Sequence, residues 1–313
     1  MAFTMLKQSG HLRMQSISSP DQLQMIGFIE LERLYSHGPY FQERAITALP
    51  GMLLILEKTS PRSLIATMNS PGCAIILPMK DQTDAIFNGQ SWRVTQLGIA
   101  RGQVPIDLYD PTPDVFAIIR FTSSMQNRDW ETTEGRLRLQ AASADDIFRL
   151  QRIVRKILAS SCAMPRQQFS AEAEIIKQEL VDALDQTLIS QDVRQGNCRS
   201  FEKHRQLVSR LDEFVRSRPD ATFSGEILAK ELSTSIRTLQ LAVREIQGTS
   251  LHNHLRARKL WSLRAQLVKG LPSGTVSSAA SANGFFHMGE LARLYKATFG
   301  EVPSETLLRS RRS

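Results

Sequence analysis

The feature that most constrains the fold of this 313-residue chain is a pattern that occurs twice in its last third, with an offset of 52 residues. Each copy predicts a short helix, a tight turn and a second amphipathic helix that ends at a glycine. The second turn falls at Gly284, where a left-handed backbone is easiest. Between the copies, residues 251–270 predict one long connecting helix. The offset aligns Leu239 with Leu291, Val243 with Tyr295, Arg244 with Lys296, and Gly248 with Gly300.

Two short helices joined by a tight turn are typical of a helix-turn-helix, whose second helix fits the roughly 12 Å major groove of DNA. The apolar stripe of each second helix is expected to face inward, which leaves its polar side chains free to meet base edges and phosphates. For Arg293 the alternative is an ion pair with Glu290, three residues earlier. The expected base readers are Arg237, Gln240, His287, Glu290 and Arg293, and the expected phosphate contacts are Arg244 and Lys296.

The positive charge of the chain lies entirely in this last third. Residues 1–200 carry 21 basic and 21 acidic side chains, whereas residues 201–313 carry 18 basic and 10 acidic ones, an excess equal to the net charge of +8. Such asymmetry favours a polyanion partner for one half of the chain. The alternative is an all-helical bundle with a solvated basic surface.

The first 200 residues predict a different architecture. Short runs rich in Leu, Ile and Val occupy residues 51–121, and Asn88-Gly89 is a two-residue hairpin signal, so we expect a small antiparallel barrel or sandwich. Residues 21–36 suggest a lead-in helix. Ser143 and Ser170 are expected to cap two amphipathic helices. Their apolar stripes could pack on the barrel or on a second copy of the chain.

The candidate ligand site in this part of the chain has little motif support. Trp92, Tyr109 and Met79 could line a pocket for a small organic effector, although such residues also commonly fill the interior of a small barrel. A metal-binding barrel needs clustered His and carboxylate ligands, but residues 1–200 hold only His11 and His37. We therefore expect no metal and no cofactor. The tripeptide His252-Asn253-His254 resembles a nuclease motif, but nothing else supports one, so its imidazoles are expected at the surface or on phosphate.

The segment GFFHMGELARLYKATFGEVPSE, which begins at Gly284, resembles the C-terminal signature of the AraC family of bacterial transcription regulators. The upstream LAKELSTSIRTLQ and LRARKL resemble the first helix-turn-helix of that family and the start of its connecting helix. The resemblance covers about residues 203–310. It departs from the family pattern at Leu291 and Val243, where Phe is common, and at Leu251, where Pro is usual. The resemblance implies DNA binding, and a cupin-like sensing and dimerisation domain often precedes such a domain in the family.

Together these observations predict an α+β chain: a cupin-like antiparallel β-barrel with flanking helices, then an all-α domain with two helix-turn-helix units joined by a long helix. We expect a sensing domain over residues 1–160, a dimerisation helix and linker over 161–200, and a DNA-binding domain over 201–313. The odd number of cysteines favours a reducing cytoplasm.

The expected function is that of a transcription regulator, not an enzyme. Its expected partners are double-stranded DNA, RNA polymerase, a small organic effector and a second copy of the chain, with no membrane. Two alternatives remain. The DNA-binding module could be fused to a metal-binding or enzymatic cupin domain, or the first domain could be a protein-interaction platform without a ligand.

Overall fold

The structure, a computed structural model, describes residues 6–18, 28–36, 39–122, 128, 135–189, 199–218, 221, 223–271 and 274–311. The chain divides into two compact units, and the boundary along the chain falls between Gly196 and Asn197. Most of the expected linker, residues 191–200, lies outside the described residues. A search of the described helices finds none with the length and apolar character needed to span a membrane.

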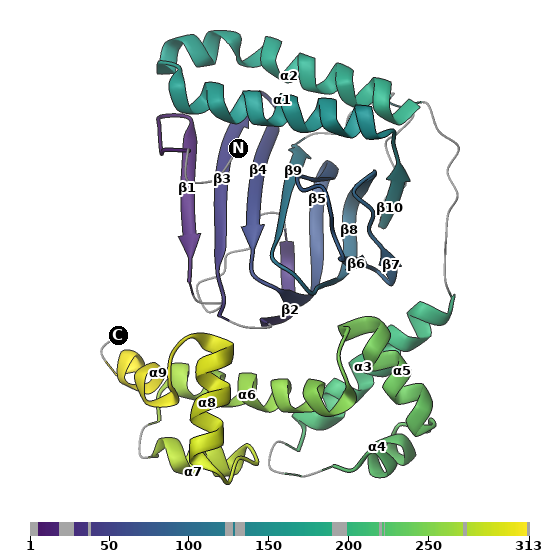
Figure 1. The fold of residues 1–313 in the computed structure, drawn as a ribbon, viewed down its shortest axis with the longest axis vertical. Helices are drawn as coiled ribbons and strands as arrows, with labels where there is room; N and C mark the ends of the chain where they lie inside the picture. Colours follow the sequence, from purple (N-terminus) through teal and green to yellow (C-terminus); the bar gives the residue numbers. More distant parts are fainter. Residues whose placement is uncertain are drawn as a thin grey trace. The chain divides into compact units, whose positions relative to one another are not determined.

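The first unit is built on a ten-stranded sheet, in which every pairing with a described register is antiparallel (Figure 1). The order of the main path is β1-β3-β4-β9-β5-β8-β6-β7, while β10 pairs with β8 and β2 pairs with β5. The strands are β1 (Leu12–Ile17), β2 (Phe28–Ser36), β3 (Gln42–Leu49), β4 (Met52–Thr59), β5 (Arg62–Pro78), β6 (Ile86–Phe87), β7 (Gln90–Ser91), β8 (Gln96–Asp110), β9 (Asp114–Phe121) and β10 (Arg136–Ala141).

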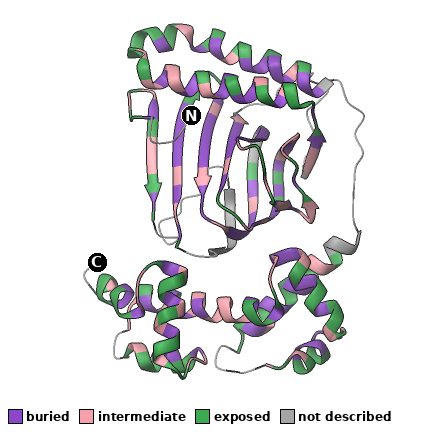
Figure 2. Ribbon diagram, in the orientation of Figure 1, coloured by how far each residue is buried: buried purple, intermediate pink, exposed green. Residues whose placement is uncertain are grey.

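Side-chain alternation gives this sheet two different buried faces, because successive residues of a strand point to opposite sides. On β4, Leu54 and Leu56 belong to a cluster that also contains the apolar stripes of two helices, whereas Glu57 lines a cavity on the other face. On β9, Ala117 and Ile119 face the helices and Phe116 faces the cavity. The strands are therefore buried along much of their length (Figure 2).

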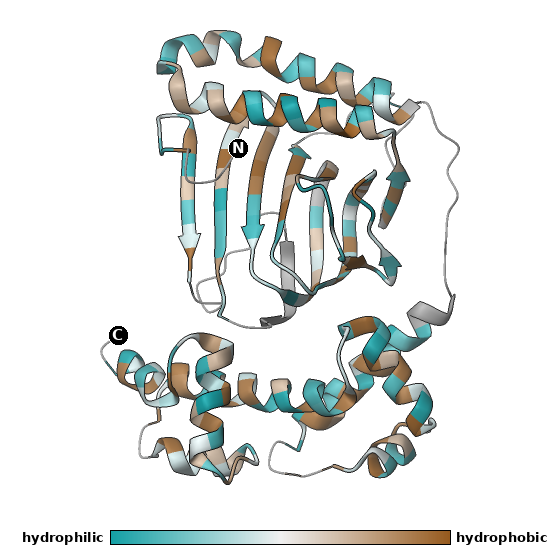
Figure 3. Cartoon of the chain, viewed as in Figure 1, coloured by the Kyte–Doolittle hydropathy of each residue, from teal (hydrophilic) through white to brown (hydrophobic). Residues whose placement is uncertain are grey.

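The two helices that cover the first face are α1 (Ala144–Ala163) and α2 (Arg166–Ile189). Ser143 caps α1 as predicted, since its side chain accepts a hydrogen bond from the backbone N of Asp146 at 3.0 Å. The predicted cap at Ser170 is wrong, because α2 begins a turn earlier, after Pro165, and Phe169 is buried in the core there. Both apolar stripes belong to one hydrophobic cluster with the strands of the same chain, and Figure 3 shows hydrophobic residues, in brown, along both helices and the strands.

The strand predictions are partly confirmed. Asn88 and Gly89, at φ of +47° and +74°, form the predicted two-residue turn between β6 and β7. The two runs predicted between residues 63 and 79 are one strand, β5, with an irregular register between Ser70 and Cys73. The lead-in helix predicted over residues 21–36 is wrong, because residues 28–36 form β2, which pairs with β5, and residues 21–27 lie outside the described residues.

The second unit is helical, and its central element is the long helix α6 (Leu251–Lys269), which confirms the predicted connecting helix. The first half of α6 joins one hydrophobic core through Leu251 and Leu255, and its second half joins another through Leu260, Leu263 and Leu267. The other helices are α3 (Arg199–Arg216), α4 (Gly225–Glu231), α5 (Ile236–Gln247), α7 (Val276–Ala282), α8 (Met288–Phe299) and α9 (Pro303–Ser310).

Candidate nucleic-acid interface

Helix α5 presents one polar face to solvent and buries the other. Ser235 caps its start by accepting a hydrogen bond from the backbone N of Thr238 at 3.0 Å, and Gly248 ends it in the left-handed conformation, at φ of +61°. The buried stripe includes Leu239, Val243 and Ile246. The predicted DNA-facing residues of this helix, all exposed, are Arg237, Gln240 and Arg244, and Leu241 is exposed between them.

Helix α8 repeats this arrangement with a different beginning. It follows a turn in which Gly284 has φ of +76°, and its N-cap residue, His287, makes no side-chain capping hydrogen bond. Leu291, Tyr295 and Phe299 are buried, and Gly300 ends the helix at φ of +78°. The four predicted DNA-facing residues, all exposed, are His287, Glu290, Arg293 and Lys296.

None of these seven side chains forms a hydrogen bond or an ion pair with another residue in the described part of the chain. In particular, the structure does not contain the ion pair between Arg293 and Glu290 that the sequence left open. Charged side chains elsewhere in the unit do pair, for example Arg264 and Arg309 with Glu301. The exposed faces of α5 and α8 therefore offer donors and acceptors that are available to a partner.

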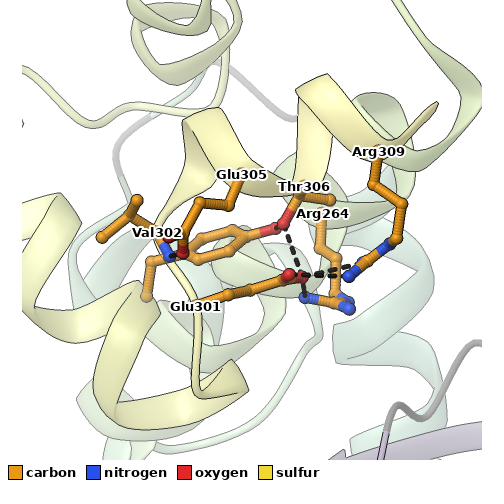
Figure 4. Close-up of polar contacts among 7 residues, drawn as sticks. Arg264, Glu301, Val302, Glu305, Thr306 and Arg309 are labelled. Carbon is orange, nitrogen blue, oxygen red and sulfur yellow. Dashed lines mark hydrogen bonds and ion pairs between the residues drawn. The ribbon is translucent and has the colours of Figure 1, made fainter. Parts of the chain in front are cut away.

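A buried polar network holds the C-terminal end of α8 against α6 and α9 (Figure 4). Arg264 is almost fully buried, and its Nη1 donates to Glu301 Oε1 at 3.0 Å. Arg309 donates to both oxygens of the same carboxylate, at 2.7 and 2.8 Å. The hydroxyls of Tyr295 and Thr306 lie 2.9 Å apart, and Thr306 donates to Glu301. This network fixes the helix that carries the exposed residues.

Two pKa shifts reflect this network. Burial acts to raise the pKa of Glu301, but the hydrogen bonds from Arg309 and Thr306 and the charge of Arg264 outweigh it and hold the pKa below its usual value. Burial raises the pKa of Tyr295 above its usual value. Glu301 is therefore ionised, and Tyr295 is neutral, at pH 7.

A second buried network anchors α6 to α3. Asp212 is fully buried, its Oδ1 lies 2.7 Å from His254 Nε2, and its Oδ2 lies 2.8 Å from Arg258 Nη1. The prediction that both histidines of the HNH tripeptide lie at the surface is therefore wrong for His254, which is buried, and right for His252, which is exposed. The signal that could have located His254 is its place three residues after the buried Leu251 on one helix face.

A groove of about 270 Å³ runs beside α8 within this unit and collects several basic side chains. It brings the predicted residues His287 and Glu290 together with three residues of α6: His252, Arg256 and Lys259. Phe286, in the turn before α8, also lines it and is 70% exposed. The sequence prediction placed His252 at the surface or on phosphate but did not include Arg256 and Lys259, although their charge and helical spacing signal a basic face.

In the first unit the structure separates the three predicted ligand contacts. Trp92 lines the cavity of about 30 Å³ on the side of the sheet away from the helices. Met79 instead packs in the cluster that includes α1 and α2, and Tyr109 is not among the cavity-lining residues. The cavity contains three ionisable residues that the sequence prediction did not include: Glu57, Arg62 and Asp110. Among the described residues, no group of three or more His, Cys, Asp or Glu side chains could hold a metal ion.

Comparison with known proteins agrees with the geometry of the second unit. A family model described as "Helix-turn-helix domain" matches residues 228–309, which run from α4 into α9. "XylDLEGF operon transcriptional activator 3" of Pseudomonas putida is 35% identical over 150 residues, which cover 47% of this chain and 42% of that protein. "XylDLEGF operon transcriptional activator 2" of the same organism is 32% identical over 136 residues, which cover 43% of this chain and 84% of that protein.

The chain belongs to the AraC family of transcriptional regulators. The match spans less than half the length of the first of these two activators. Among solved structures, a probable AraC family regulator from Rhodopseudomonas palustris is 30% identical and covers 34% of this chain and 97% of that chain, with a TM-score of 0.31. ToxT from Vibrio cholerae is 10% identical and covers 95% and 98% of the two chains, also with a TM-score of 0.31.

Proposed function

We propose that this protein is a sequence-specific DNA-binding transcription activator with two helix-turn-helix units, one formed by α4 and α5 and the other by α7 and α8. The observation that carries the proposal is the set of seven exposed side chains on α5 and α8, none of which pairs with another described residue of the protein. Because the buried faces of both helices are fixed by packing, the backbone positions that carry these side chains are fixed without a partner.

Each exposed side chain then has a role that its chemistry suits. Arg237 and Arg293 offer the planar donor fork that binds guanine, Gln240 can read adenine, and Glu290 can accept from the amino group of cytosine. His287, at the start of α8, is the remaining base reader. Arg244 and Lys296 lie in the last turns of their helices and contact phosphates, which position the protein without specifying sequence.

The single helix α6 connects both units, so the two recognition helices are expected to enter successive major grooves about one helical turn apart. The first unit of the chain, a cupin-like barrel in this proposal, binds a small effector and contributes to a homodimer. Effector binding shifts the arrangement of the dimer on DNA and thereby the recruitment of RNA polymerase. The apolar stripes of α1 and α2 are buried against their own sheet, so a dimer contact through these helices would use their outer faces, where Phe148 and Ile175 are exposed.

Selection of preferred sequences from a random duplex pool, using the full chain at near-physiological salt, tests the proposal. The expected result is a bipartite motif with two blocks about 10 base pairs apart. Selection with the Arg293→Ala variant should no longer enrich one of the two blocks. The matched control Arg216→Ala removes an equally exposed arginine at the end of α3 and should keep both blocks. Binding that is salt-sensitive but enriches no sequence would contradict sequence-specific recognition.

A further inference from the structure

The cavity of the first unit has an apolar wall and a charged end. Its apolar lining comes from the four strands β5, β6, β8 and β9 and from the residue after β7, and includes Phe87, Trp92 and Phe116. Three ionisable residues interrupt this lining: Glu57 on β4, Arg62 at the start of β5 and Asp110 at the end of β8. A buried charge is stable only when its neighbours satisfy it, so the partners of each group decide what the cavity can bind.

Glu57 is satisfied within the protein. Its Oε1 accepts hydrogen bonds from Arg44 Nε, at 2.5 Å, and from Gln42 Nε2. Arg44 and Glu57 are 2% and 7% exposed, so they form a buried ion pair on adjacent strands, with Arg44 opposite Glu57 in the register of β3 and β4. This pair needs no ligand.

Arg62 is as buried as Arg44, at 2% exposed, but it lacks such a partner. Its Nε and Nη1 atoms are buried and have no hydrogen-bond acceptor in the described part of the chain. The guanidinium lies 5.8 Å from the centre of the Phe116 ring, a contact that satisfies no N–H group. Two orphaned donors on a buried cation are a costly feature, and the planar fork of an arginine matches a carboxylate in particular.

Asp110 faces Arg62 in the register of β5 and β8 but forms no hydrogen bond with it. Burial and the neighbouring charge of Asp114 raise the pKa of Asp110 to about 7, against the opposing charges of Arg62 and Lys80. At neutral pH the carboxyl of Asp110 is therefore protonated about half of the time, and it supplies only part of the counter-charge for Arg62.

We propose that this cavity binds the carboxylate of a small organic acid, which accepts hydrogen bonds from Arg62, while the apolar body of the acid lies against Trp92 and Phe87. The inference rests on the proposed function, since it gives the chemical class of the effector of the first unit. A neutral effector of the same shape would leave the guanidinium buried and unpaired, and would bind less well for that reason.

The size of the cavity implies that its wall moves when an acid enters. A volume of about 30 Å³ holds a carboxylate group but not an attached apolar body. Phe87 and Trp92, which contact each other edge to face at 5.5 Å, come from the β6–β7 hairpin and the residue after it. Each strand of this hairpin has only two residues, so it has few backbone hydrogen bonds to lose when it opens.

Thermal unfolding and calorimetric titration of the full chain with acetate, propionate, butyrate and hexanoate test the proposal, with the matching primary amides as neutral controls. The acids should raise the unfolding temperature and the amides should not, because only the acids carry a charge that completes the counter-charge of Arg62. Arg62→Met should weaken acid binding at least about tenfold. The control Lys58→Met removes a surface cation on β4, 41% exposed, and should leave acid binding unchanged.

A second variant keeps the test decisive if Arg62→Met does not fold. Arg62→Lys retains the charge but not the planar fork, and it should also bind the acids more weakly than the wild type. Equal binding of acids and amides, acid binding that survives both substitutions, or no binding of any acid would each overturn the proposal. DNA selection without any acid separates the two proposals: an enriched motif without acid binding would leave the regulator function intact and refute only the ligand class.

Discussion

The two helix pairs of the second unit, α4–α5 and α7–α8, have the same turn and helix-end geometry, but different helices pack against them. In both, a residue with positive φ forms the turn, Ser233 at +52° in the first and Gly284 at +76° in the second, and a left-handed glycine ends the exposed helix. The first pair is covered by α3, which precedes it, through an aliphatic core. The second is covered by α9, which follows it, through a core that includes Tyr295, Phe299 and the partly buried Trp261.

The two ion pairs that hold α6, here called the charged anchors, also involve different neighbouring segments. Both are built on α6, from Arg258 in the first half and Arg264 in the second. The acid partner of Arg258 is Asp212 on α3, and that of Arg264 is Glu301, in the turn between α8 and α9. Asp212 is fully buried, whereas Glu301 is 17% exposed and shared between two arginines. In this unit, therefore, two different helices, α3 and α9, cover the two helix pairs.

The largest expected effect is the loss of the fully buried anchor. Asp212→Ala leaves His254 and Arg258 without their carboxylate and should lower the free energy of unfolding by about 3–5 kcal/mol. Glu301→Ala should cost less, because water reaches its site and can solvate Arg309. Urea unfolding of both variants measures the difference. Equal costs would show that burial does not distinguish the two anchors.

The next effect concerns DNA recognition by each pair. Arg237→Ala and Arg293→Ala should each weaken binding to the selected sequence by about 1–3 kcal/mol. Each should also reduce the sequence preference in a different block of the motif. Their thermal stability should stay close to that of the wild type, because both side chains are exposed and neither forms a hydrogen bond or an ion pair with another described residue. Sequence selection with each variant checks the assignment. If both variants lost sequence preference in the same block, α5 and α8 could not contact separate blocks of the motif.

The smallest effects come from the two turns, and they should have opposite signs. Ser233→Gly relieves a positive φ that serine tolerates poorly and should stabilise the protein by up to about 1 kcal/mol. Gly284→Ala introduces that strain and places a Cβ 2.7 Å from Lys259 Nζ, the flexible end of a side chain, so it should cost about 1–2 kcal/mol. Thermal unfolding measures both. Substitutions that shift stability in the same direction would contradict a common turn geometry.

The sequence predicted best those features that depend on neighbours within one helix or turn. The stripes of α5 and α8, the extent of α6 and the Asn88-Gly89 turn follow from spacing of three to four residues or from the φ preference of single residues. The long strand β8 escaped prediction because Gly98, Gly102 and Pro105 interrupt its pattern, although β5 and β10 pair with it along much of its length. The strand β2 was mistaken for a helix, because a pairing with a distant strand overrides a local pattern.

The exposed polar faces of α5 and α8 and the basic character of the second unit follow from the sequence alone, because both are properties of short segments and of composition. Only the tertiary structure decided which charges are paired. Arg44 and Arg62 look alike in the sequence and are equally buried, yet strand register places Glu57 within hydrogen-bonding distance of the first and leaves two donors of the second unsatisfied. The first pair joins two strands that a short turn connects, whereas the strand opposite Arg62 is the distant β8, and no local pattern encodes that neighbour.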